Sequence, residues 1–453
     1  MQNPETLSRA ETLVPRYTSY PTAPHFTPQV GATAVGGWLE RLDPTHGVSV
    51  YIHVPFCAKL CWYCGCNTSV SARYEPVRSY FDTLLDEIAA VRALLSGKLR
   101  ASHVHLGGGT PNALAAADLA RLADALRNTF AFDADTRFEV EIDPRTLDAA
   151  TARALADAGV TRVNLGIQDF DPKVQSAINR IQPLELVGEK LALLYGAGLE
   201  QFGVDLLYGL PYQTPDTLAR TVAQVDELGA SRVALFGYAH VPWMKPHQKL
   251  LEPHGLPDTA ERLALAASAH VALAQRGYAR IGIDHFARPD DEIAVAARDG
   301  VLRRNFQGYT TDTADTLLGF GPSAISAYAQ GYAQNHTRLD SWQASVKEGS
   351  LPVARGLSLS GEDRVRSNAI ERLMCDMTVD LGKIAQAHRL AAHPLDYFAT
   401  SLAQIDRLAA DGLCIRNGLR VTIPPGMANY ARIVASAFDQ YLARDDAKHS
   451  VAV

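Results

Sequence analysis

The residues in this sequence best suited to chemistry are four cysteines within ten positions, Cys57, Cys61, Cys64 and Cys66. Three chemistries compete for them. A structural zinc site usually joins two short ligand pairs from separate segments, and no second pair follows at the usual distance. A redox pair would use Cys61 and Cys64 but would leave Cys57 unexplained. An iron–sulfur cluster accepts several thiolates from one loop, and the C-x3-C-x2-C spacing favours it, with one iron left open.

A second group of candidate residues follows the ends of predicted strands. The Gly-Gly-Gly-Thr run at 107–110 lacks the remainder of a P-loop, so it forms either a tight turn or a cradle for a ligand. Glu141 and Asp205 end two other strands, where ligands of parallel sheets bind, although an isolated carboxylate is often merely solvated. Gln168 can donate and accept hydrogen bonds, and Arg180 suits a carboxylate or lies on a helix surface.

The elements that must position these residues alternate from residue 48 onward. The hydrophobic pattern predicts strands over 48–54, 103–106, 137–142, 162–167, 202–207, 232–237 and 279–283. It predicts helices between them over 77–95, 114–130, 147–158, 186–195, 217–228 and 259–276. Such alternation indicates an α/β fold with a parallel sheet, either doubly wound or curved into a barrel. Seven strands are one short of a closed (β/α)8 ring, so a partial barrel is compatible.

Three parts are predicted along the chain. Residues 1–46 are rich in proline and predict an extended N-terminal arm without a long helix. Residues 47–340 form the α/β unit, and their last stretch, 286–340, looks irregular and long enough to be functional. Residues 341–453 look mostly helical, with a β-hairpin over 413–423 around Asn417-Gly418. Equal numbers of acidic and basic residues over 360–453 argue against a DNA-binding winged helix and favour a cover domain.

The composition is that of an ordinary globular protein, with 47% hydrophobic and 20% charged residues and a net charge of −6. This balance argues against a nucleic-acid partner and an anionic membrane partner. No apolar run reaches the ~18 residues that span a bilayer, and no secretory signal is recognisable. We therefore predict a cytoplasmic protein without disulfides, in which Cys375 and Cys414 are buried packing residues.

The cysteine spacing, with the aromatic Tyr63 before Cys64, resembles that of the radical SAM superfamily. From about residue 13 to the C-terminus, the chain is also similar to the oxygen-independent coproporphyrinogen III oxidase family of heme biosynthesis. The segments that carry this resemblance are 15–23, 53–67, 105–111, 141–145, 205–211, 284–291 and 304–311. The segments 15–23, 284–291 and 304–311 lie outside the part that is common to radical SAM proteins, so they mark the subfamily. Val14 and Leu106 depart mildly from the family pattern.

The resemblance implies a partial (β/α) radical SAM barrel with an N-terminal arm and a mostly helical C-terminal cover domain. It implies a 4Fe–4S cluster with three ligands, Cys57, Cys61 and Cys64, and a fourth iron bound by S-adenosylmethionine (SAM). Two SAM molecules are expected. The residues expected at the first are Tyr51, Gly108, Glu141 and Ile325, of which Tyr51 and Glu141 are assigned the catalytic role. The residues expected at the second are Tyr63, Gly109, Thr110, Gln168, Arg180, Asp205 and Ala239. Cys66 matches a family cysteine that is not a cluster ligand.

The implied reaction is the oxidative decarboxylation of two propionates of coproporphyrinogen III to vinyl groups, which gives protoporphyrinogen IX. A substrate with four carboxylates needs cations, for which we predict Arg16, Arg288, Arg303 and Arg304. Tyr17 and Tyr20 are predicted along the macrocycle. The resemblance also implies a low-potential electron donor, an electron acceptor and a monomeric enzyme. Two alternatives stay open: the heme-trafficking homologue of the same family, and a radical SAM methyltransferase or heme-opening enzyme of related architecture.

Overall fold

A parallel ladder of six strands forms the middle of the largest sheet in the computed structural model, which describes residue 9 and residues 11–442. Each strand pairs in parallel with the next one along the chain. The strands are β1 (Val48–Val54), β4 (Leu99–Gly108), β6 (Arg137–Ile142), β7 (Arg162–Gln168), β8 (Phe202–Tyr208) and β9 (Arg232–Gly237). The bounds of five of these strands agree with the prediction within one residue, whereas β4 is longer at both ends than the predicted strand over 103–106. Both the α/β class and the parallel sheet are confirmed.

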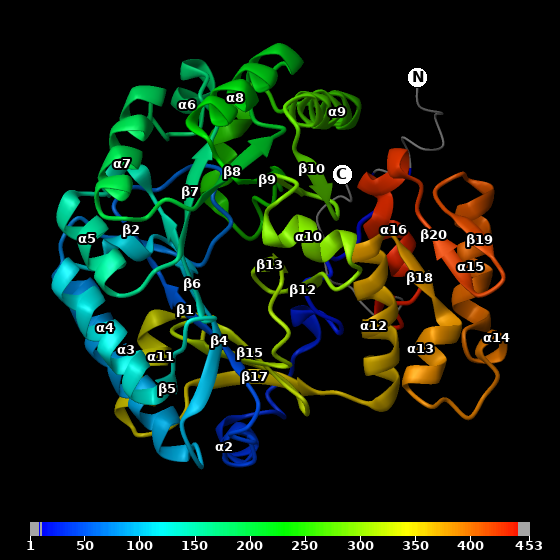
Figure 1. The fold of residues 1–453 in the computed structure, drawn as a ribbon, viewed down its shortest axis with the longest axis horizontal. Coiled ribbons are helices and arrows are strands. Elements are labelled where there is room, and N and C mark those ends of the chain that lie inside the picture. Colours follow the sequence, from blue (N-terminus) through cyan, green and yellow to red (C-terminus); the bar gives the residue numbers. More distant parts are fainter. Residues whose placement is uncertain (1–8, 10, 443–453) are drawn as a thin grey trace.

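Helices cover the outer side of this curved sheet, as Figure 1 shows from α3 at the lower left to α9 at the top. They are α3 (Glu75–Leu94), α4 (Ala116–Thr129), α5 (Ala149–Asp157), α6 (Pro172–Ala177), α7 (Leu184–Gly196), α8 (Pro215–Leu228) and α9 (Thr259–Gln275). Local chemistry sets their ends. Thr214 forms a capping box at the start of α8, and Gly229, with φ +85°, ends that helix in the left-handed region. The short strand β5 (Phe130–Ala131) follows α4 and pairs with β4.

The seventh predicted strand does not extend the parallel ladder. β10 (Ala279–Ile281) pairs antiparallel with β11 (His285–Ala287), and β11 lies between β10 and β9. β10 and β11 pair antiparallel because the connection between them is short. Only residues 282–284 join β10 to β11, and a parallel crossover needs a dozen residues or more. Gly282, with φ +59°, lets the chain reverse here.

The prediction that residues 286–340 are irregular was wrong. They contain α10 (Glu292–Arg298), a hairpin of β12 (Arg303–Asn305) and β13 (Gly308–Thr310), and three sheet strands. β14 (Thr316–Phe320) pairs in parallel with β1, and the sheet continues antiparallel through three further strands. These are β15 (Ile325–Tyr328), β16 (Gly331–Asn335) and β17 (Val353–Ser358). Since β17 belongs to this sheet, the sheet runs past the division predicted at 340/341, and α11 (Leu339–Lys347) packs against α3.

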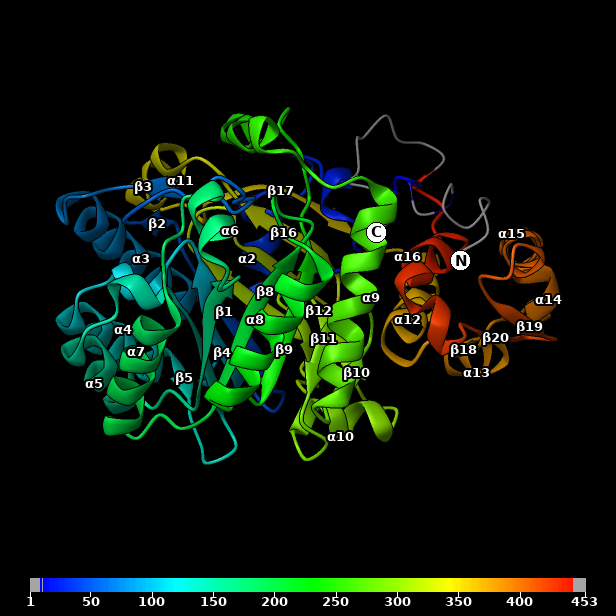
Figure 2. The same ribbon diagram turned by 90° about the horizontal axis from the view of Figure 1, so that it is seen from above.

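A second hydrophobic core begins with α12 (Gly361–Asp376) and lies beside the open end of the sheet, on the right of Figures 1 and 2. Its helices are α12, α13 (Leu381–Ala387), α14 (Pro394–Tyr397), α15 (Ala399–Ala410) and α16 (Ala431–Ser436). The predicted hairpin is confirmed as β19 (Ile415–Asn417) and β20 (Arg420–Thr422), with Gly418 at φ +61° in the turn, and β18 (Thr378–Asp380) pairs with β20. The last eleven residues of the predicted C-terminal part lie outside the described residues.

The N-terminal arm joins the two cores. Val14, Tyr17 and Tyr20 are buried in the second core, whereas Trp38 and Leu39 are buried in the first. The arm also contains α2 (Ala32–Glu40), a nine-residue helix that the sequence did not predict and that fits between two prolines of the arm, Pro28 and Pro44. In the part of the chain that the structure describes, no helix has both the length and the apolarity needed to cross a bilayer.

Candidate active site

The cysteine loop leaves the carboxyl end of β1 and is enclosed by two short strands, β2 (Phe56–Cys57) and β3 (Ser69–Val70). Segments from distant parts of the barrel hold it. The Trp62 amide donates to the Ile178 carbonyl over 3.0 Å, and the Asn179 side chain donates to the Leu60 carbonyl over 2.8 Å. The segment η4 (Pro246–His254) covers the other side, where Gln248 donates to the Tyr63 carbonyl over 2.9 Å. The loop is therefore fixed at several points.

The thiols of this loop have different neighbours. Cys57 Sγ lies 3.3 Å from the hydroxyls of both Thr68 and Thr110, and burial raises the pKa of this thiol. A hydrogen bond from Cys66 lowers the pKa of Cys64 to about 6. Cys66 itself is exposed. Cys375 and Cys414 are buried far from the loop, as predicted. Across residue 9 and residues 11–442, no three His, Cys, Asp or Glu side chains converge as they would on a single metal ion.

The neighbours of Cys61 are charged. This thiol is 6% exposed, and its Sγ lies 3.4 Å from Nη2 of Arg145 and 3.4 Å from Nη1 of Arg180. Both guanidinium groups also pair with Asp143, at 2.6 Å and 3.4 Å. Arg145 and Asp143 lie in the family segment 141–145, but the sequence suggests no role for either, because only the fold brings their side chains to Cys61.

The glycine run at the end of β4 is closely packed, so it is not merely a flexible turn. A Cβ atom on Gly107 would lie 2.8 Å from Glu141 Oε1, and one on Gly109 would lie 2.6 Å from Thr68 Oγ1. Gly108 has φ +112°, and a Cβ atom there would lie 2.7 Å from His53. Its amide donates to Glu141 Oε2 over 3.2 Å. The glycines therefore allow β4 to pass close to the cysteine loop and to hold Glu141 in place.

Glu141 is held from a second side by a histidine. His105 Nε2 lies 3.2 Å from Glu141 Oε1, and Nδ1 of the same ring lies 3.8 Å from Glu139. Tyr51 stacks on His105 with 5.9 Å between the ring centres and donates from its hydroxyl to His53 Nδ1 over 3.1 Å. His53 Nε2 lies 2.8 Å from the Asn67 carbonyl, which can only accept, so Nε2 carries the proton. Tyr51, Gly108 and Glu141, predicted together, are thus neighbours.

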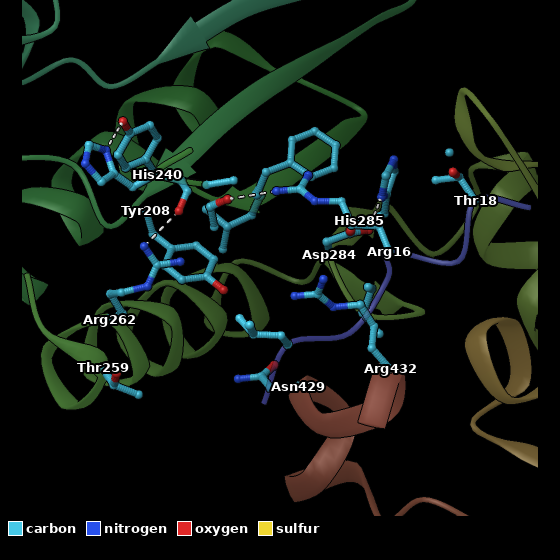
Figure 3. Close-up of a pocket in the computed structure, with 18 of the residues that line it drawn as sticks. Arg16, Thr18, Tyr208, His240, Thr259, Arg262, Asp284, His285, Asn429 and Arg432 are labelled. Carbon is cyan, nitrogen blue, oxygen red and sulfur yellow. Dashed lines mark hydrogen bonds and ion pairs between the residues drawn. The ribbon is translucent and has the colours of Figure 1, made fainter. Parts of the chain in front are cut away.

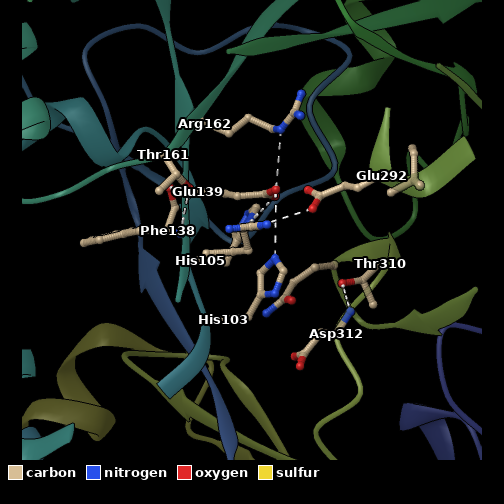
Figure 4. A network of polar contacts seen from close by, with 12 residues as sticks. His103, His105, Phe138, Glu139, Thr161, Arg162, Glu292, Thr310 and Asp312 are labelled. Carbon is tan, nitrogen blue, oxygen red and sulfur yellow. Dashed lines mark hydrogen bonds and ion pairs between the residues drawn. The ribbon is translucent and has the colours of Figure 1, made fainter. Parts of the chain in front are cut away.

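A buried charge network continues below Glu141 inside the barrel (Figure 4). Glu139 lies 3.9 Å from His103, 3.8 Å from Arg162 and 3.4 Å from Arg232. Arg232 in turn pairs with Asp291 and Glu292 at 2.8 Å and 2.7 Å. These residues alternate along strands, so they face one side of the sheet, but nothing in their spacing marks them as functional, and sequence reasoning missed them.

The residues predicted for the second SAM lie at neighbouring strand ends. Arg180 is buried and donates Nη2 to the Gly166 carbonyl at the end of β7, where Gln168 has a positive φ of 71°. Asp205, on β8, accepts from Asn164 over 2.8 Å. Burial, with the charge of Glu141 as the next cause, raises the pKa of Asp205 to about 6. Ala239 lies further along the same edge, in the wall of a large cavity, and Ile325 begins β15.

This cavity has a volume of 780 Å³ and lies between the ends of β8 and β9, the arm, the β12–β13 hairpin and the second core (Figure 3). Four arginines line it: Arg16, Arg262, Arg304 and Arg432. Figure 3 shows Arg16 on the arm, Arg262 on α9 and Arg432 on α16, and Arg304 belongs to β12. The buried acid facing them is Asp284. Burial would raise its pKa, but Arg304 and His285 outweigh this and lower it to about 2. The wall therefore carries a cationic excess.

Comparison with known proteins agrees with this geometry. A model of the radical SAM superfamily matches residues 51–225. Oxygen-independent coproporphyrinogen III oxidases of Bradyrhizobium diazoefficiens and Paracoccus denitrificans are each 42% identical, over 99% and 96% of both chains. A solved structure, coproporphyrinogen III oxidase (HemN) from Escherichia coli, a radical SAM enzyme, superposes with a TM-score of 0.89 at 38% identity and covers 94% of this chain and 97% of its own. The chain belongs to the oxygen-independent coproporphyrinogen III oxidase family.

Membership of the coproporphyrinogen III oxidase family favours the iron–sulfur interpretation of the cysteines over zinc and over a redox pair. The predicted substrate residues can now be compared with the residues that line the large cavity. Arg16 and Arg304 line the large cavity, as expected of them. Arg262 and Arg432 line it as well and were missed. Each looks like an ordinary helix arginine in sequence, and no signal there could have singled it out.

Four other residues predicted at the substrate lie outside the large cavity. Arg288 lies at the opposite end of β9, where it pairs with Asp226 at 2.5 Å and covers the Tyr278 ring at 4.1 Å. Arg303 pairs with Glu371 at 2.9 Å. Tyr17 and Tyr20 are buried, with their hydroxyls bonded to Asp439 and to the Gln440 amide. Arg303 and the two tyrosines line an adjoining cavity of only 170 Å³.

Proposed function

We propose that this chain decarboxylates two propionates of coproporphyrinogen III oxidatively, which gives protoporphyrinogen IX, and that the large cavity holds the substrate. The observation that carries the proposal is that the charge and size of coproporphyrinogen III match the wall of the large cavity. A porphyrinogen with four carboxylates fits a 780 Å³ cavity lined by four arginines, in a chain 42% identical to relatives of that name. The cavity opens beside the strand ends that carry the cysteine loop and Glu141.

The donor set of the loop fits a 4Fe–4S cluster. Cys57, Cys61 and Cys64 would hold it, and each of these sulfurs has a hydrogen-bonding neighbour in the structure. When bound, the reduced cluster and SAM supply a carbon-centred radical able to take a hydrogen atom from the β-carbon of a propionate. The protein must orient SAM and exclude water from it. The closely packed glycine run at 107–109, beside the cysteine loop, would do both.

Glu141 and Tyr51 belong to the first SAM site in this proposal. Because the Gly108 amide and His105 both donate to Glu141, its carboxylate is oriented before a ligand arrives, and it suits the SAM ammonium group. Ile325 would pack against the adenosyl part. The second SAM would take Tyr63, Gly109, Thr110, Gln168, Arg180, Asp205 and Ala239. In support, Arg180 Nε is buried without a hydrogen-bond partner, so one N–H remains available to a carboxylate.

For the substrate, the arginines differ in how firmly they are held. Arg262 donates Nη1 to the Tyr238 carbonyl over 2.8 Å, and its Nε is buried without a partner. Arg304 lies over the Tyr309 ring at 4.4 Å, and its Nε is also without a partner. Buried donors without partners cost free energy that a bound carboxylate would recover. Phe236, Phe306 and other aromatic residues of the wall would contact the pyrrole rings.

An anaerobic assay of the reconstituted protein tests this proposal. With SAM, a strong reductant, an electron acceptor and coproporphyrinogen III, we expect protoporphyrin after oxidation and 5′-deoxyadenosine in step with it. Arg262→Gln should raise the KM for the porphyrinogen about tenfold, because one charge-assisted contact is lost. Arg288→Gln is the matched control, since this arginine lies outside the cavity, and its KM should equal that of the wild type.

SAM cleavage without protoporphyrin would contradict the proposed reaction and would favour the heme-trafficking or methyltransferase alternatives. Equal KM values for both arginine variants would remove the large cavity from the substrate site. The electron donor, the electron acceptor, the monomeric state and the cytoplasmic location remain predictions from the resemblance.

A further inference from the structure

The three sulfurs assigned to the cluster do not receive the same hydrogen bonds. Cys57 receives two neutral hydroxyls, from Thr68 and Thr110, at 3.3 Å each. Cys61 receives two guanidinium N–H groups at 3.4 Å each, from Arg145 and Arg180. Charge-assisted hydrogen bonds are roughly twice as strong as neutral ones, so the donors to Cys61 are stronger than the donors to Cys57.

Arg145 is held in place by a single neighbour. It lies in η3 (Pro144–Thr146), directly after β6, and Asp143 caps this turn by accepting from the Arg145 amide over 3.1 Å. The same carboxylate accepts from Arg145 Nε over 2.9 Å and from Nη2 over 2.6 Å. Because this fork is bidentate, only one orientation of the guanidinium remains, and in that orientation Nη2 points to Cys61. The Arg145 side chain is 14% exposed, and that of Asp143 is 8% exposed.

Arg180 reaches the same sulfur from the connection between α6 and α7. Its side chain is 7% exposed, and it pairs with Asp143 at 3.4 Å. Two guanidinium groups and one carboxylate thus leave a net positive charge against Cys61. A lysine could not replace Arg145 here, because its single ammonium group cannot bridge both Asp143 and the sulfur in the planar arrangement that a guanidinium allows.

We propose that Arg145, oriented by Asp143, is a positioning residue that raises the reduction potential of the cluster through its hydrogen bond to Cys61 Sγ. The inference rests on the proposed function, because it requires the cluster. Reduction adds one electron, and therefore one negative charge, to the cluster and its thiolates. N–H donors aimed at a ligand sulfur stabilise the reduced state more than the oxidised state. Burial strengthens this effect, since little water screens the charge.

The test is a redox titration of the reconstituted protein, in which the reduced fraction is followed by EPR against the solution potential set with dithionite. In Arg145→Gln, the ratio of reduced to oxidised cluster at a fixed potential should fall about tenfold, which corresponds to about 59 mV for a one-electron couple. Lys59→Gln is the matched control. It removes the same charge from an exposed position in the same loop, and its potential should equal that of the wild type.

A wild-type potential in Arg145→Gln with full iron content would overturn the inference, as would an equal shift in Lys59→Gln. If Arg145→Gln binds no iron, Arg145→Lys decides: a potential below the wild type supports the inference, and an unchanged one overturns it. Failure of the proposed function looks different. In that case the wild-type protein itself forms no 4Fe–4S cluster or makes no protoporphyrin, whatever the variants do.

Discussion

His105 has an unusual charge state for a histidine inside a barrel. Burial alone would lower its pKa, but the hydrogen bonds to Glu139 and Glu141 and their charges outweigh burial and raise the pKa to about 10. The imidazolium is therefore the stable form at neutral pH, and its charge lies between the carboxylates of Glu139 and Glu141. One of them, Glu141, is the residue proposed to bind the SAM ammonium group.

His105 should make the stability of the protein depend on pH. A folded-state pKa above the unfolded value of 6.5 stabilises the fold fully below about pH 6.5, and this stabilisation is lost as the pH rises towards 10. In thermal unfolding, the difference between wild type and His105→Gln should be largest near pH 6 and should shrink towards pH 10. A difference that stays constant over this range would contradict the assignment of charge.

Replacing Glu141 should weaken the first SAM site directly. In Glu141→Gln, the charge-assisted contact with the ammonium group is lost, so SAM affinity should fall about 10- to 100-fold. Equilibrium binding to the reconstituted protein measures this. Glu141→Asp keeps the charge and should lose less affinity. Equal losses in both variants would show that the shape of the site, and not the charge, decides binding.

Residue types alone predicted part of this site and not the rest. The cysteine spacing and the strand-end acids could be found because each is marked by local sequence. Arg262 and His105 could not, because the role of each depends on neighbours that are far away in sequence. The position of Arg288 could not be predicted either: it follows β11, which runs antiparallel to β9, so the chain carries it to the end of the barrel opposite the cavity.

At the scale of elements, long strands with helical crossovers were predictable, and short antiparallel strands were not. β1, β6 and β9 agree with the prediction to the residue, because each has a clear strand pattern, with nearly continuous burial in β1, three consecutive buried residues in β9 and alternating burial in β6. β11 to β16 have three to five residues each, too few for a periodic pattern to show. Their place in the sheet is set by pairing partners elsewhere, and above all by β1, which accepts β14 along its free edge.

Two glycines offer a test of how tightly these elements pack. A Cβ atom on Gly331, in β16, would lie 2.0 Å from the Leu357 carbonyl, so Gly331→Ala should destabilise the fold by about 3 kcal/mol. Gly36, in the interior of α2, has no atom within 4 Å of its Cβ position, so Gly36→Ala should stabilise by about 1 kcal/mol. Thermal midpoints measure both. Shifts of the same sign would refute this picture of the packing.

At the scale of the whole molecule, the arm connects the two cores through Tyr20. Its ring is 2% exposed in the second core, and its hydroxyl accepts from the Gln440 amide over 3.0 Å. Its carbonyl accepts from the Tyr332 hydroxyl, in β16 of the large sheet, over 3.3 Å. One arm residue therefore contacts both halves of the molecule, next to Arg16 and Thr18 in the cavity wall.

Removing this connection should affect stability and substrate binding together. Tyr20→Ala should cost about 3–5 kcal/mol in the free energy of unfolding, the usual cost of truncating a buried aromatic ring. It should also raise the KM for the porphyrinogen, because Arg16 loses its anchor. Limited proteolysis and steady-state kinetics measure the two effects. Tyr195→Ala, at a ring that is 44% exposed on α7, is the control and should change neither.

The cavity wall combines Arg16 and Arg432, residues separated by almost the whole length of the chain. During translation, the parallel strands can pair as they leave the ribosome, whereas the arm must wait for its partners in the second core until the chain is nearly finished. The wall of the large cavity is thus complete only when the chain is nearly finished. A nascent or prematurely terminated chain can complete its cysteine loop but cannot bring all four arginines together.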